Sequence, residues 1–300
     1  LLLKEWNPDS VRIYSRGELL QWEMQQKIHD DRLRFLIGDV RDTDRLYRAM
    51  NDVDIVVHAA ALKQVPAAEY NPMEAVKTNI DGAANIINAS IDNGVERVMA
   101  LSTDKAVHPV NLYGATKMVA EKLFVQGNAY AGGRKTRFAC TRYGNVVGSR
   151  GSIIPLFLEQ RKQGRVTITD ERMTRFWLTL EQGARFVAHC IETMKGGEIF
   201  VPRIPSMRIT DLAKVIAPDC NVEIIGIRPG EKLHEVLLTE DEARHSKDMG
   251  DYFVIEPELR FWNRNNGHEG KPLPEGFRYS SESNTTWLDA DELMSMVDIS

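Results

Sequence analysis

The chain has 300 residues, of which 43% are apolar and 27% are charged, a composition that fits a globular protein and excludes an intrinsically disordered one. The net charge of -5 provides no basic surface for a phosphate backbone, so we expect no nucleic-acid partner. No apolar run reaches the ~20 residues of a membrane span and no signal peptide is recognisable, so we expect a cytoplasmic protein without a membrane partner.

The cysteines and histidines do not indicate a disulfide framework or a metal centre. Cys140, Cys190 and Cys220 are widely spaced and form no C-x-x-C pair, so we expect free structural thiols. The seven histidines show no metal-ligand spacing. We therefore predict no metal.

Short β-branched runs alternate with longer segments of helical period over the first half of the chain. The expected strands are residues 11–14, 33–37, 55–58, 98–102 and 137–143, and the expected helices are residues 43–50, 73–92 and 112–130. Strands that alternate with helices form parallel sheets covered on both faces. The sequence therefore predicts an α/β fold with a doubly wound, Rossmann-like parallel sheet.

Beyond Tyr143 the alternation weakens, because glycines and prolines interrupt the apolar segments. We expect residues 1–145 to form the Rossmann-like domain and residues 182–202 to return to its sheet. Residues 146–300 should form a smaller C-terminal lobe, in which residues 262–276 are loop-like.

Tyr113 and Lys117 lie four positions apart, hence on one face of a helix. A free tyrosine has a pKa of ~10, and a fixed cation nearby favours the phenolate. The pair is then a usable base near neutral pH. The alternative is a solvent-exposed pair without function, because this spacing is common by chance in helices.

The strand at residues 98–102 ends in Ser102, Thr103, Asp104 and Lys105, about ten residues before Tyr113. Catalytic groups of parallel sheets gather at the carboxyl ends of the strands, so we expect a hydroxyl, an acid and a second cation to face one crevice. The alternative for Asp104 and Lys105 is a solvated turn.

Three other strand ends suggest a dinucleotide. Ala59 and Ala60 are small enough for a ligand to approach the backbone, or alternatively for tight packing of a helix. Asp39 could accept a hydrogen bond from an adenine amine, or cap the next helix. Arg16 stands where an NAD-binding fold commonly has an acid, which favours NADP, although the nearby Glu18 leaves NAD open.

Two arginines of the C-terminal lobe, Arg175 and Arg228, could hold a diphosphate, because guanidinium groups match phosphate oxygens. Each could equally form a surface salt bridge.

Several sequence blocks together resemble one family, the inverting UDP-N-acetylglucosamine 4,6-dehydratases of the extended short-chain dehydrogenase/reductase type. The blocks are residues 14–16, 38–42, 58–63, 69–72, 101–105, 111–117, 142–151, 173–176 and 227–235. Relatives that retain configuration at C5 typically have Asp-Glu in place of Asp104-Lys105, so the lysine indicates the inverting branch.

The resemblance implies a role for each catalytic residue. Tyr113 would remove the C4 hydroxyl proton while NADP⁺ accepts the C4 hydride, and Lys117 would lower the tyrosine pKa and hold the ribose. Lys105 would take the C5 proton, and Asp104 would protonate the departing C6 hydroxyl. We expect the pKa of Lys105 to fall well below ~10.4 through repulsion by Lys117 and the nicotinamide.

The resemblance also implies the remaining site residues. Thr103 belongs with the catalytic group. The cofactor site comprises Ser15, Arg16, Asp39, Val40, Ala59, Ala60, Leu101, Ser102, Tyr113, Lys117 and Tyr143. The substrate site comprises Lys63, Asn145, Val146, Val147, Gly148, Ser149, Arg150, Arg175, Arg228 and Glu231. The implied product is UDP-2-acetamido-2,6-dideoxy-β-L-arabino-hex-4-ulose, for pseudaminic acid synthesis and flagellin glycosylation, made by a homo-oligomer, either a dimer or a hexamer.

The chain departs from the family at its start, where members have a strand and a Gly-rich turn that cradles the cofactor pyrophosphate. Residues 1–6 would then be the end of the following helix, with on the order of 30 residues preceding them. Without that turn we expect weak NADP binding. The alternatives are a UDP-sugar 4-epimerase, which has no need of Asp104 and Lys105, and a non-enzymatic nucleotide-binding protein.

Overall fold

A computed structural model describes residues 1–149, 152–259, 262 and 267–297 of the chain. The first half alternates strands and helices, as expected. Its elements are α1 (Leu2–Glu5), β1 (Val11–Ser15), α2 (Glu18–Lys27), β2 (Leu33–Ile37), α3 (Thr43–Met50), β3 (Ile55–His58), α4 (Val65–Tyr70), α5 (Pro72–Val76), the π-helix η1 (Lys77–Asp81), α6 (Gly82–Asp92), β4 (Arg97–Thr103), the 3₁₀-helix η2 (Asp104–Ala106), α7 (Leu112–Ala131) and β5 (Arg137–Tyr143).

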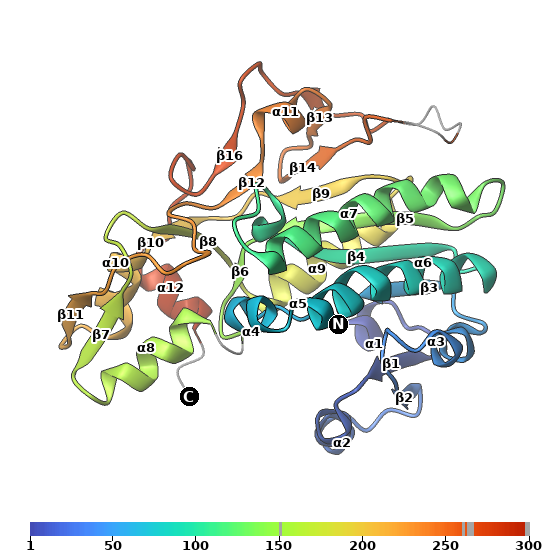
Figure 1. Cartoon of the computed structure of the whole chain (residues 1–300), viewed down its shortest axis with the longest axis horizontal. Coiled ribbons are helices and arrows are strands. Elements are labelled where there is room, and N and C mark those ends of the chain that lie inside the picture. Colours follow the sequence, from blue (N-terminus) through green and yellow to red (C-terminus); the bar gives the residue numbers. More distant parts are fainter. Residues whose placement is uncertain (150–151, 260–261, 263–266, 298–300) are drawn as a thin grey trace.

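The second half has shorter strands and fewer helices (Figure 1). Its elements are β6 (Asn145–Val146), α8 (Ile153–Arg161), β7 (Arg165–Ile168), β8 (Thr174–Leu178), α9 (Leu180–Thr193), β9 (Ile199–Pro202), β10 (Ser206–Arg208), α10 (Ile209–Ile216), β11 (Asn221–Ile224), β12 (Val236–Leu238), α11 (Glu240–Ala243), β13 (Ser246–Asp248), β14 (Tyr252–Ile255), β15 (Lys271–Pro272), β16 (Tyr279–Ser280) and α12 (Ala290–Met296).

The main sheet has the strand order β15-β13-β14-β9-β5-β4-β3. Strands β3, β4, β5 and β9 are parallel, and β14 adds to β9 in the antiparallel direction. The register pairs Thr103 with Tyr143, so β4 and β5 end side by side. The parallel Rossmann-like sheet predicted from the sequence is confirmed, and residues 199–202 return to it through β9.

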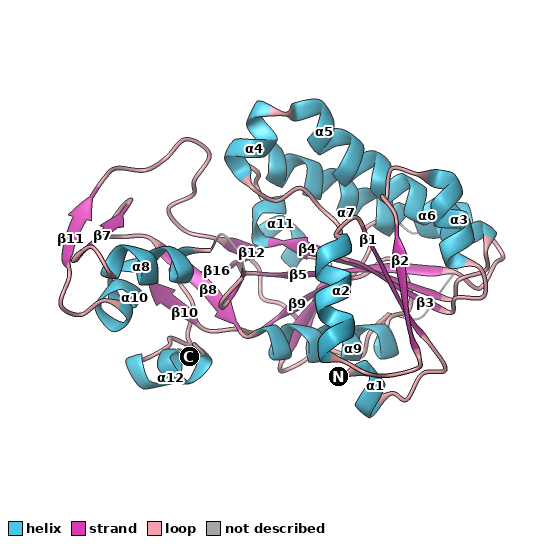
Figure 2. Ribbon diagram, turned by 90° about the horizontal axis from the view of Figure 1, so that it is seen from below, coloured by secondary structure: helices cyan, strands magenta, loops and turns pink. Residues whose placement is uncertain are grey.

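Helices cover both faces of this sheet. Successive side chains of a strand point to opposite faces, and both sets are apolar here and need to be buried. Val98 packs into the cluster that contains Ile87 of α6 and Phe124 of α7. Its neighbour Met99 packs instead into the cluster that contains Cys190 of α9. Figure 2 shows α6 and α7 on one side of the strands and α9 on the other.

Strands β1 and β2 form a separate parallel pair, with Val11 opposite Leu33. Gln21 of α2 fixes this pair, since its side-chain amide donates to the carbonyl oxygens of Ser15 and Leu36 at 3.2 Å and 3.0 Å. Among the described strands, β1 pairs only with β2, and β3 pairs only with β4.

The smaller lobe packs α8, α10 and α12 around a second core, in which Trp177 and Leu212 are fully buried. The expected boundary needs one correction, because β13, β14 and β15 were assigned to this lobe but belong to the main sheet. The buried run from Phe253 to Ile255 pairs with β9, which places these strands at the edge of the Rossmann-like domain. The segment 262–276, expected to be loop-like, contains β15 and lies partly outside the described residues.

The remaining expectations concern helices and special sites. The helix expected at residues 73–92 is interrupted by η1. The three cysteines are free, as predicted. Over the ranges that the structure describes, no helix is long and apolar enough to cross a membrane, and no cluster of three or more His, Cys, Asp or Glu side chains could hold a metal ion.

Candidate active site

The end of β4 and the start of α7 are built to meet. Thr103 caps η2, because its hydroxyl accepts from the Lys105 backbone N–H at 3.3 Å. Asn111 caps α7 by accepting from the Gly114 N–H at 2.8 Å. A Cβ on Gly114 would overlap the carbonyl oxygen of Lys105, so only glycine lets α7 approach η2 this closely. Tyr113 is thereby held beside Thr103 and Asp104, as predicted.

Asp104 and Lys105 form a hydrogen-bonded ion pair and not a solvated turn. The Asp104 side chain is only 1% exposed, and its Oδ1 accepts from Lys105 Nζ at 3.0 Å and from the Thr103 hydroxyl at 2.8 Å. Among the described atoms, Oδ2 of Asp104 is buried without a hydrogen-bond partner. The acid therefore has a free oxygen that could carry a proton.

The charge state of Lys105 differs from the expectation. Burial lowers the pKa of this amine, but the carboxylates of Asp104 and Glu235 outweigh burial, and its pKa is raised above 10.5. The ammonium in turn helps to lower the pKa of Asp104 against the effect of burial. The predicted lowering of the Lys105 pKa by Lys117 is wrong for this structure, because Lys105 faces two acids.

The expected effect of Lys117 on the pKa of Tyr113 also needs correction. Lys117 is 5% exposed and donates to the carbonyl oxygen of Leu101 at 2.7 Å, and burial lowers its pKa. Burial raises the pKa of Tyr113, and the cation that opposes this rise is Lys105. The expected lowering of the tyrosine pKa by Lys117 is therefore not observed, because desolvation dominates.

Two charged residues of the smaller lobe complete the cluster, and neither was predicted. Glu235 lies with Oε1 at 3.5 Å from Lys105 Nζ. Lys232 donates to the backbone carbonyls of Asp104 and Val107 at 3.1 Å and 2.5 Å. In the motif at residues 227–235 the predicted site residues are Arg228 and Glu231, but its lysine and its last glutamate contact the Asp104–Lys105 pair.

Asn79 is a further residue that the sequence did not reveal. It lies in η1, is 2% exposed, and its side chain bonds both the N–H and the carbonyl of Leu62, at 2.8 Å and 3.0 Å. Its amide also donates to the Thr116 hydroxyl at 2.9 Å, which lies between Tyr113 and Lys117 on α7. Asn79 thus fixes the segment after β3 to the catalytic helix. A π-helical turn of this kind is frequent at functional sites.

The two predicted diphosphate ligands differ in orientation. Arg175 is 8% exposed, and its terminal nitrogens donate to the carbonyls of Thr174, Leu233 and Lys232 and to the Met173 sulfur. This geometry disfavours the predicted role of Arg175 in binding a diphosphate, because its donors are already used.

Arg228 is exposed, and its segment is held against α7 by a hydrogen bond of 2.8 Å from the Asn111 side chain to the Gly230 carbonyl. Glu231 accepts from the Arg228 backbone N–H at 3.3 Å.

The predicted adenosine end lies beyond β1 and β2. The guanidinium of Arg16 is half-exposed and lies 3.6 Å from Asp39. Asp39 is held mainly by Arg41, which bonds it at 2.8 Å and keeps its pKa low despite burial. Val40 is buried, and its carbonyl accepts from the Asn85 amide at 3.0 Å. Ser15 accepts from Gln21 at 2.9 Å.

The predicted nicotinamide end lies beyond β3 and β4. Ala59 and Ala60 follow β3 and are exposed, so they leave the backbone open to a ligand and do not pack under a helix. Ser102 is buried, and its hydroxyl oxygen lacks a hydrogen-bond partner among the described atoms. Burial is the main cause that raises the pKa of Tyr143 to about 12, and proximity to Tyr113 adds to it, so the two phenols are neighbours.

The predicted sugar-binding segment follows β5. Asn145 and Val146 form β6, which pairs with β8, and Val147 donates to the Leu178 carbonyl at 2.9 Å. Gly148 has a φ of 70°, and Ser149 closes a turn onto Val146. Lys63 is exposed after β3. Arg150 lies outside the described residues.

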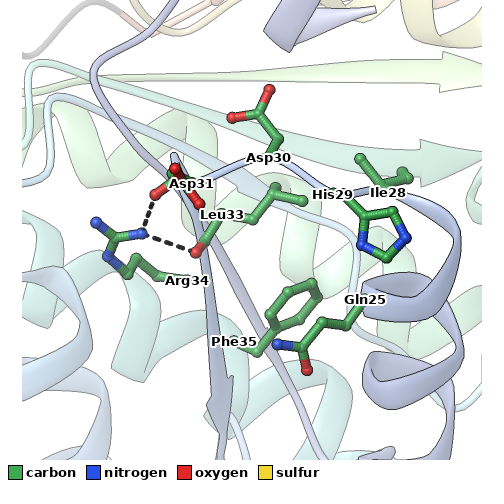
Figure 3. Close-up of a pocket in the computed structure, with 8 residues that line it drawn as sticks. All are labelled: Gln25, Ile28, His29, Asp30, Asp31, Leu33, Arg34 and Phe35. Atoms are coloured by element: carbon green, nitrogen blue, oxygen red, sulfur yellow. Dashed lines mark hydrogen bonds between the residues drawn. The ribbon is translucent and has the colours of Figure 1, made fainter.

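A separate cavity of about 380 Å³ lies at the end of α2 and the start of β2, and none of the predicted site residues lines it (Figure 3). It is lined by Gln25, Ile28, His29, Asp30, Asp31, Leu33, Arg34 and Phe35. Leu33 is the first residue of β2, whereas ligands of such sheets bind at the carboxyl ends of the strands. We therefore do not assign the chemistry to this cavity.

Comparisons with known proteins place the chain in a family. The family model described as "Polysaccharide biosynthesis protein" matches residues 2–257. The inverting UDP-N-acetylglucosamine 4,6-dehydratase of Campylobacter jejuni is 51% identical over 99% of this chain and 92% of the relative. A UDP-glucose 4-epimerase of Rickettsia canadensis is 44% identical over 82% of this chain and 73% of the relative. The X-ray structure of Pen from Bacillus thuringiensis superposes with a TM-score of 0.89 and 38% identity, over 98% of this chain and 90% of that one. The chain therefore belongs to the polysaccharide biosynthesis protein family, together with the inverting dehydratase of Campylobacter jejuni.

Proposed function

We propose that this chain removes water from UDP-N-acetylglucosamine at C4 and C6 with inversion at C5, giving UDP-2-acetamido-2,6-dideoxy-β-L-arabino-hex-4-ulose. The observation that carries the proposal is the Lys105–Asp104 ion pair, with 3.0 Å between Nζ and Oδ1, beside a buried Tyr113. A dehydration needs a base for C5 and an acid for the C6 hydroxyl, and this pair supplies both. The name of the Campylobacter jejuni relative supports the assignment.

The strand ends fit NADP as the cofactor. Exposed Ala59 and Ala60 offer an open backbone. The Ser102 hydroxyl, which has no partner among the atoms that the structure describes, could bond a ligand. The half-exposed Arg16 suits a 2′-phosphate better than a 2′-hydroxyl. A bound nicotinamide would supply the redox chemistry, as the acceptor of hydride from C4 and its donor to C6. The chain's own residues handle the protons.

Tyr113 accepts the proton of the C4 hydroxyl. Its raised pKa makes the phenol a poor base by itself, so a cation must stabilise the phenolate in the complex. Lys105 already provides one such charge, and a bound nicotinamide cation would add to it. Lys117, which is fixed to the Leu101 carbonyl, would hold the ribose, as the resemblance implies.

Lys105 and Asp104 move the C5 proton to the leaving oxygen. Transfer of one proton along their hydrogen bond converts the ammonium and carboxylate into an amine and a carboxylic acid. The amine then takes the proton from C5, and the acid gives its proton to the C6 hydroxyl, which leaves as water. Both groups end in their starting charge states, so the pair needs no outside proton for this step.

The substrate must lie between the two lobes. Arg228 with Glu231, Lys63, and the segment of Asn145, Val146, Val147, Gly148, Ser149 and Arg150 are the candidates for the diphosphate and the sugar. Exposed Lys63 and Arg228 carry the positive charge that a diphosphate requires. The resemblance further supports a cytoplasmic homo-oligomer whose product enters pseudaminic acid synthesis.

Incubation with UDP-N-acetylglucosamine and NADP⁺, followed by mass spectrometry, tests the proposal. Dehydration lowers the product mass by one water, whereas the 4-epimerase activity named for the Rickettsia canadensis relative leaves the mass unchanged. We expect Lys105→Met to abolish water loss, and the matched change Lys122→Met on the exposed side of α7 to leave it intact. An unchanged mass with the wild-type chain, together with a product epimeric at C4, would refute dehydration.

A further inference from the structure

Glu235 occupies the centre of a buried group of charges that joins the two lobes. Its side chain is only 3% exposed, and three cations surround it. Oε1 lies 3.5 Å from Lys105 Nζ and 3.7 Å from Arg175 Nε, and Oε2 lies 3.5 Å from Lys232 Nζ. Glu235 is therefore the one carboxylate of the smaller lobe that reaches the catalytic lysine among the described residues.

The backbone around Glu235 is fixed from two sides. Its N–H donates to the Ser281 hydroxyl at 2.9 Å, and its carbonyl accepts from the Ser281 N–H at 2.8 Å, which ties it to the β16 segment. Lys232, three residues earlier, is anchored to the carbonyls of Asp104 and Val107. The backbone position of Glu235 is thus fixed by contacts that do not involve the Lys105 side chain.

The lysine, by contrast, has a long side chain with little to hold it. Four rotatable bonds separate Nζ from the backbone, and the side chain is 29% exposed. Asp104 alone would hold Nζ from one direction only. A second carboxylate at 3.5 Å narrows the positions that the ammonium can occupy.

We propose that Glu235 is a positioning residue that holds the amine of Lys105 beside Asp104, so that the smaller lobe controls where and when this amine exchanges its proton. The proposal deepens the proposed function and depends on it for the role of Lys105 in catalysis. The groups that face Lys105 are the acids Asp104 and Glu235, the cations Arg175 and Lys232, and the phenol Tyr113.

Removal of the Glu235 charge has a defined consequence. Among the groups around Lys105, Glu235 acts with Asp104 to raise the lysine pKa, while Arg175 opposes them. An opposite charge within 4–6 Å shifts a pKa by about 1 to 3 units. Glu235→Gln keeps the shape of the side chain and removes its charge, so the pKa of Lys105 should fall by about that amount.

The first test measures Lys105 directly and needs no catalysis. Acetic anhydride modifies only the neutral amine, so the labelling rate of the Lys105 peptide against pH, followed by mass spectrometry, gives its titration midpoint. We expect a midpoint about 1 to 3 pH units lower in Glu235→Gln than in the wild-type chain. Glu242→Gln is the matched control, because Glu242 is also a carboxylate of this lobe paired with an arginine, Arg142. Its midpoint for Lys105 should equal that of the wild type.

The second test uses the reaction. The basic limb of the pH profile of kcat/KM, where Lys105 loses the proton that it passes to Asp104, should move to lower pH in Glu235→Gln. The value of kcat should fall while KM stays nearly constant, because the amine is less well held. Deuterium incorporation at C5 from heavy water should slow more than oxidation at C4. A residue with only a structural role would lower all of these rates together and leave the pH profile in place.

Each outcome decides the proposal. An unchanged Lys105 midpoint in Glu235→Gln, or an equal shift in Glu242→Gln, overturns it. Should Glu235→Gln fail to fold, Glu235→Asp withdraws the charge by one methylene and should give a smaller shift in the same direction, and no shift there overturns the proposal as well. Wild-type chain that releases no water refutes the proposed function, while the labelling result still decides whether Glu235 holds Lys105.

Discussion

Arg142 gives the sharpest prediction about stability, because a single side chain connects β5 to α7, to α11 and to β12. It lies on β5 and is 3% exposed, and it bonds Glu121 of α7 at 3.0 Å and 2.7 Å. Its Nη1 and Nη2 donate to Glu242 of α11 at 3.0 Å and 2.9 Å, and Nη1 also donates to the Leu237 carbonyl of β12 at 3.0 Å. Arg142 thereby fixes α7, which carries Tyr113, to the segment that follows Glu235.

We expect Arg142→Met to destabilise the protein by about 3–5 kcal/mol at pH 7.5. Loss of one partner of a buried pair costs this much because the other charge stays buried without compensation. Here two carboxylates lose their partner, and Glu121 is 2% exposed. As a matched control, Arg134→Met breaks the ion pair with Asp92 on the surface, where the side chains are 56% and 50% exposed, and should cost only ~0–1 kcal/mol.

The deficit should depend on pH. In the wild-type fold Arg142 lowers the pKa of Glu242 against the effect of burial, so this contribution is present above the ordinary carboxylate pKa and is lost as the pH falls through the lowered value. In Arg142→Met the stranded carboxylates can take up protons, which removes the penalty in acid. Urea denaturation at pH 7.5 and pH 4.5 measures both effects. A deficit under ~1 kcal/mol at pH 7.5, or one that grows in acid, would refute the reasoning.

Three further predictions address the site. Tyr113→Phe should lower kcat by about 10²- to 10⁴-fold, the usual contribution of one acid–base group, while calorimetry shows an unchanged affinity for the UDP-sugar. His58 is buried. Burial, and to a smaller extent the charge of Lys117, lowers its pKa to about 3. The folded state therefore does not bind the proton that the unfolded state binds below pH 6.5. The wild type should therefore lose about 2 kcal/mol of stability between pH 6.5 and pH 5 through this residue, and His58→Asn should lose correspondingly less in urea titrations. Arg16→Glu should weaken NADP binding by at least about 10-fold and leave NAD binding nearly unchanged, as fluorescence titration would show; equal losses for both cofactors would contradict the 2′-phosphate assignment.

The sequence predicted those parts of the site that local pattern controls. Parallel strands put their carboxyl ends at one edge, and helical spacing puts Tyr113 and Lys117 on one face, so the meeting of Tyr113 with Asp104 followed from periodicity. The same local information explains why β2, β3 and β5 were placed correctly. Each of these strands is a short apolar run bounded by a turn.

The sequence could not predict the contacts that tertiary packing brings together. Lys232 and Asp104 are 128 residues apart, and nothing in the motif at residues 227–235 indicates which of its charges faces the catalytic pair. Asn79 lay within a continuous helical pattern, in which a π-helical turn leaves no periodic signal. The pKa directions of Tyr113 and Lys105 were wrong for a related reason, because desolvation and second-lobe carboxylates depend on burial that spacing does not reveal.

The same buried charges bear on the choice between a dehydratase and an epimerase. Tyr113 and Lys117 would serve either reaction, and relatives with both names resemble the chain. Burial of Asp104, Glu235 and Lys105 costs free energy that an apolar cluster of similar volume would not, so stability does not account for the arrangement. A 4-epimerase moves no proton at C5 and expels no hydroxyl from C6, and would leave this ion pair idle. A dehydratase would use both of its members, because in the proposed mechanism the proton that Lys105 takes from C5 is matched by the proton that Asp104 gives to the departing oxygen. Dehydration requires an acid and a base that are hydrogen-bonded to each other. This requirement explains why the protein keeps a buried charged cluster that costs free energy.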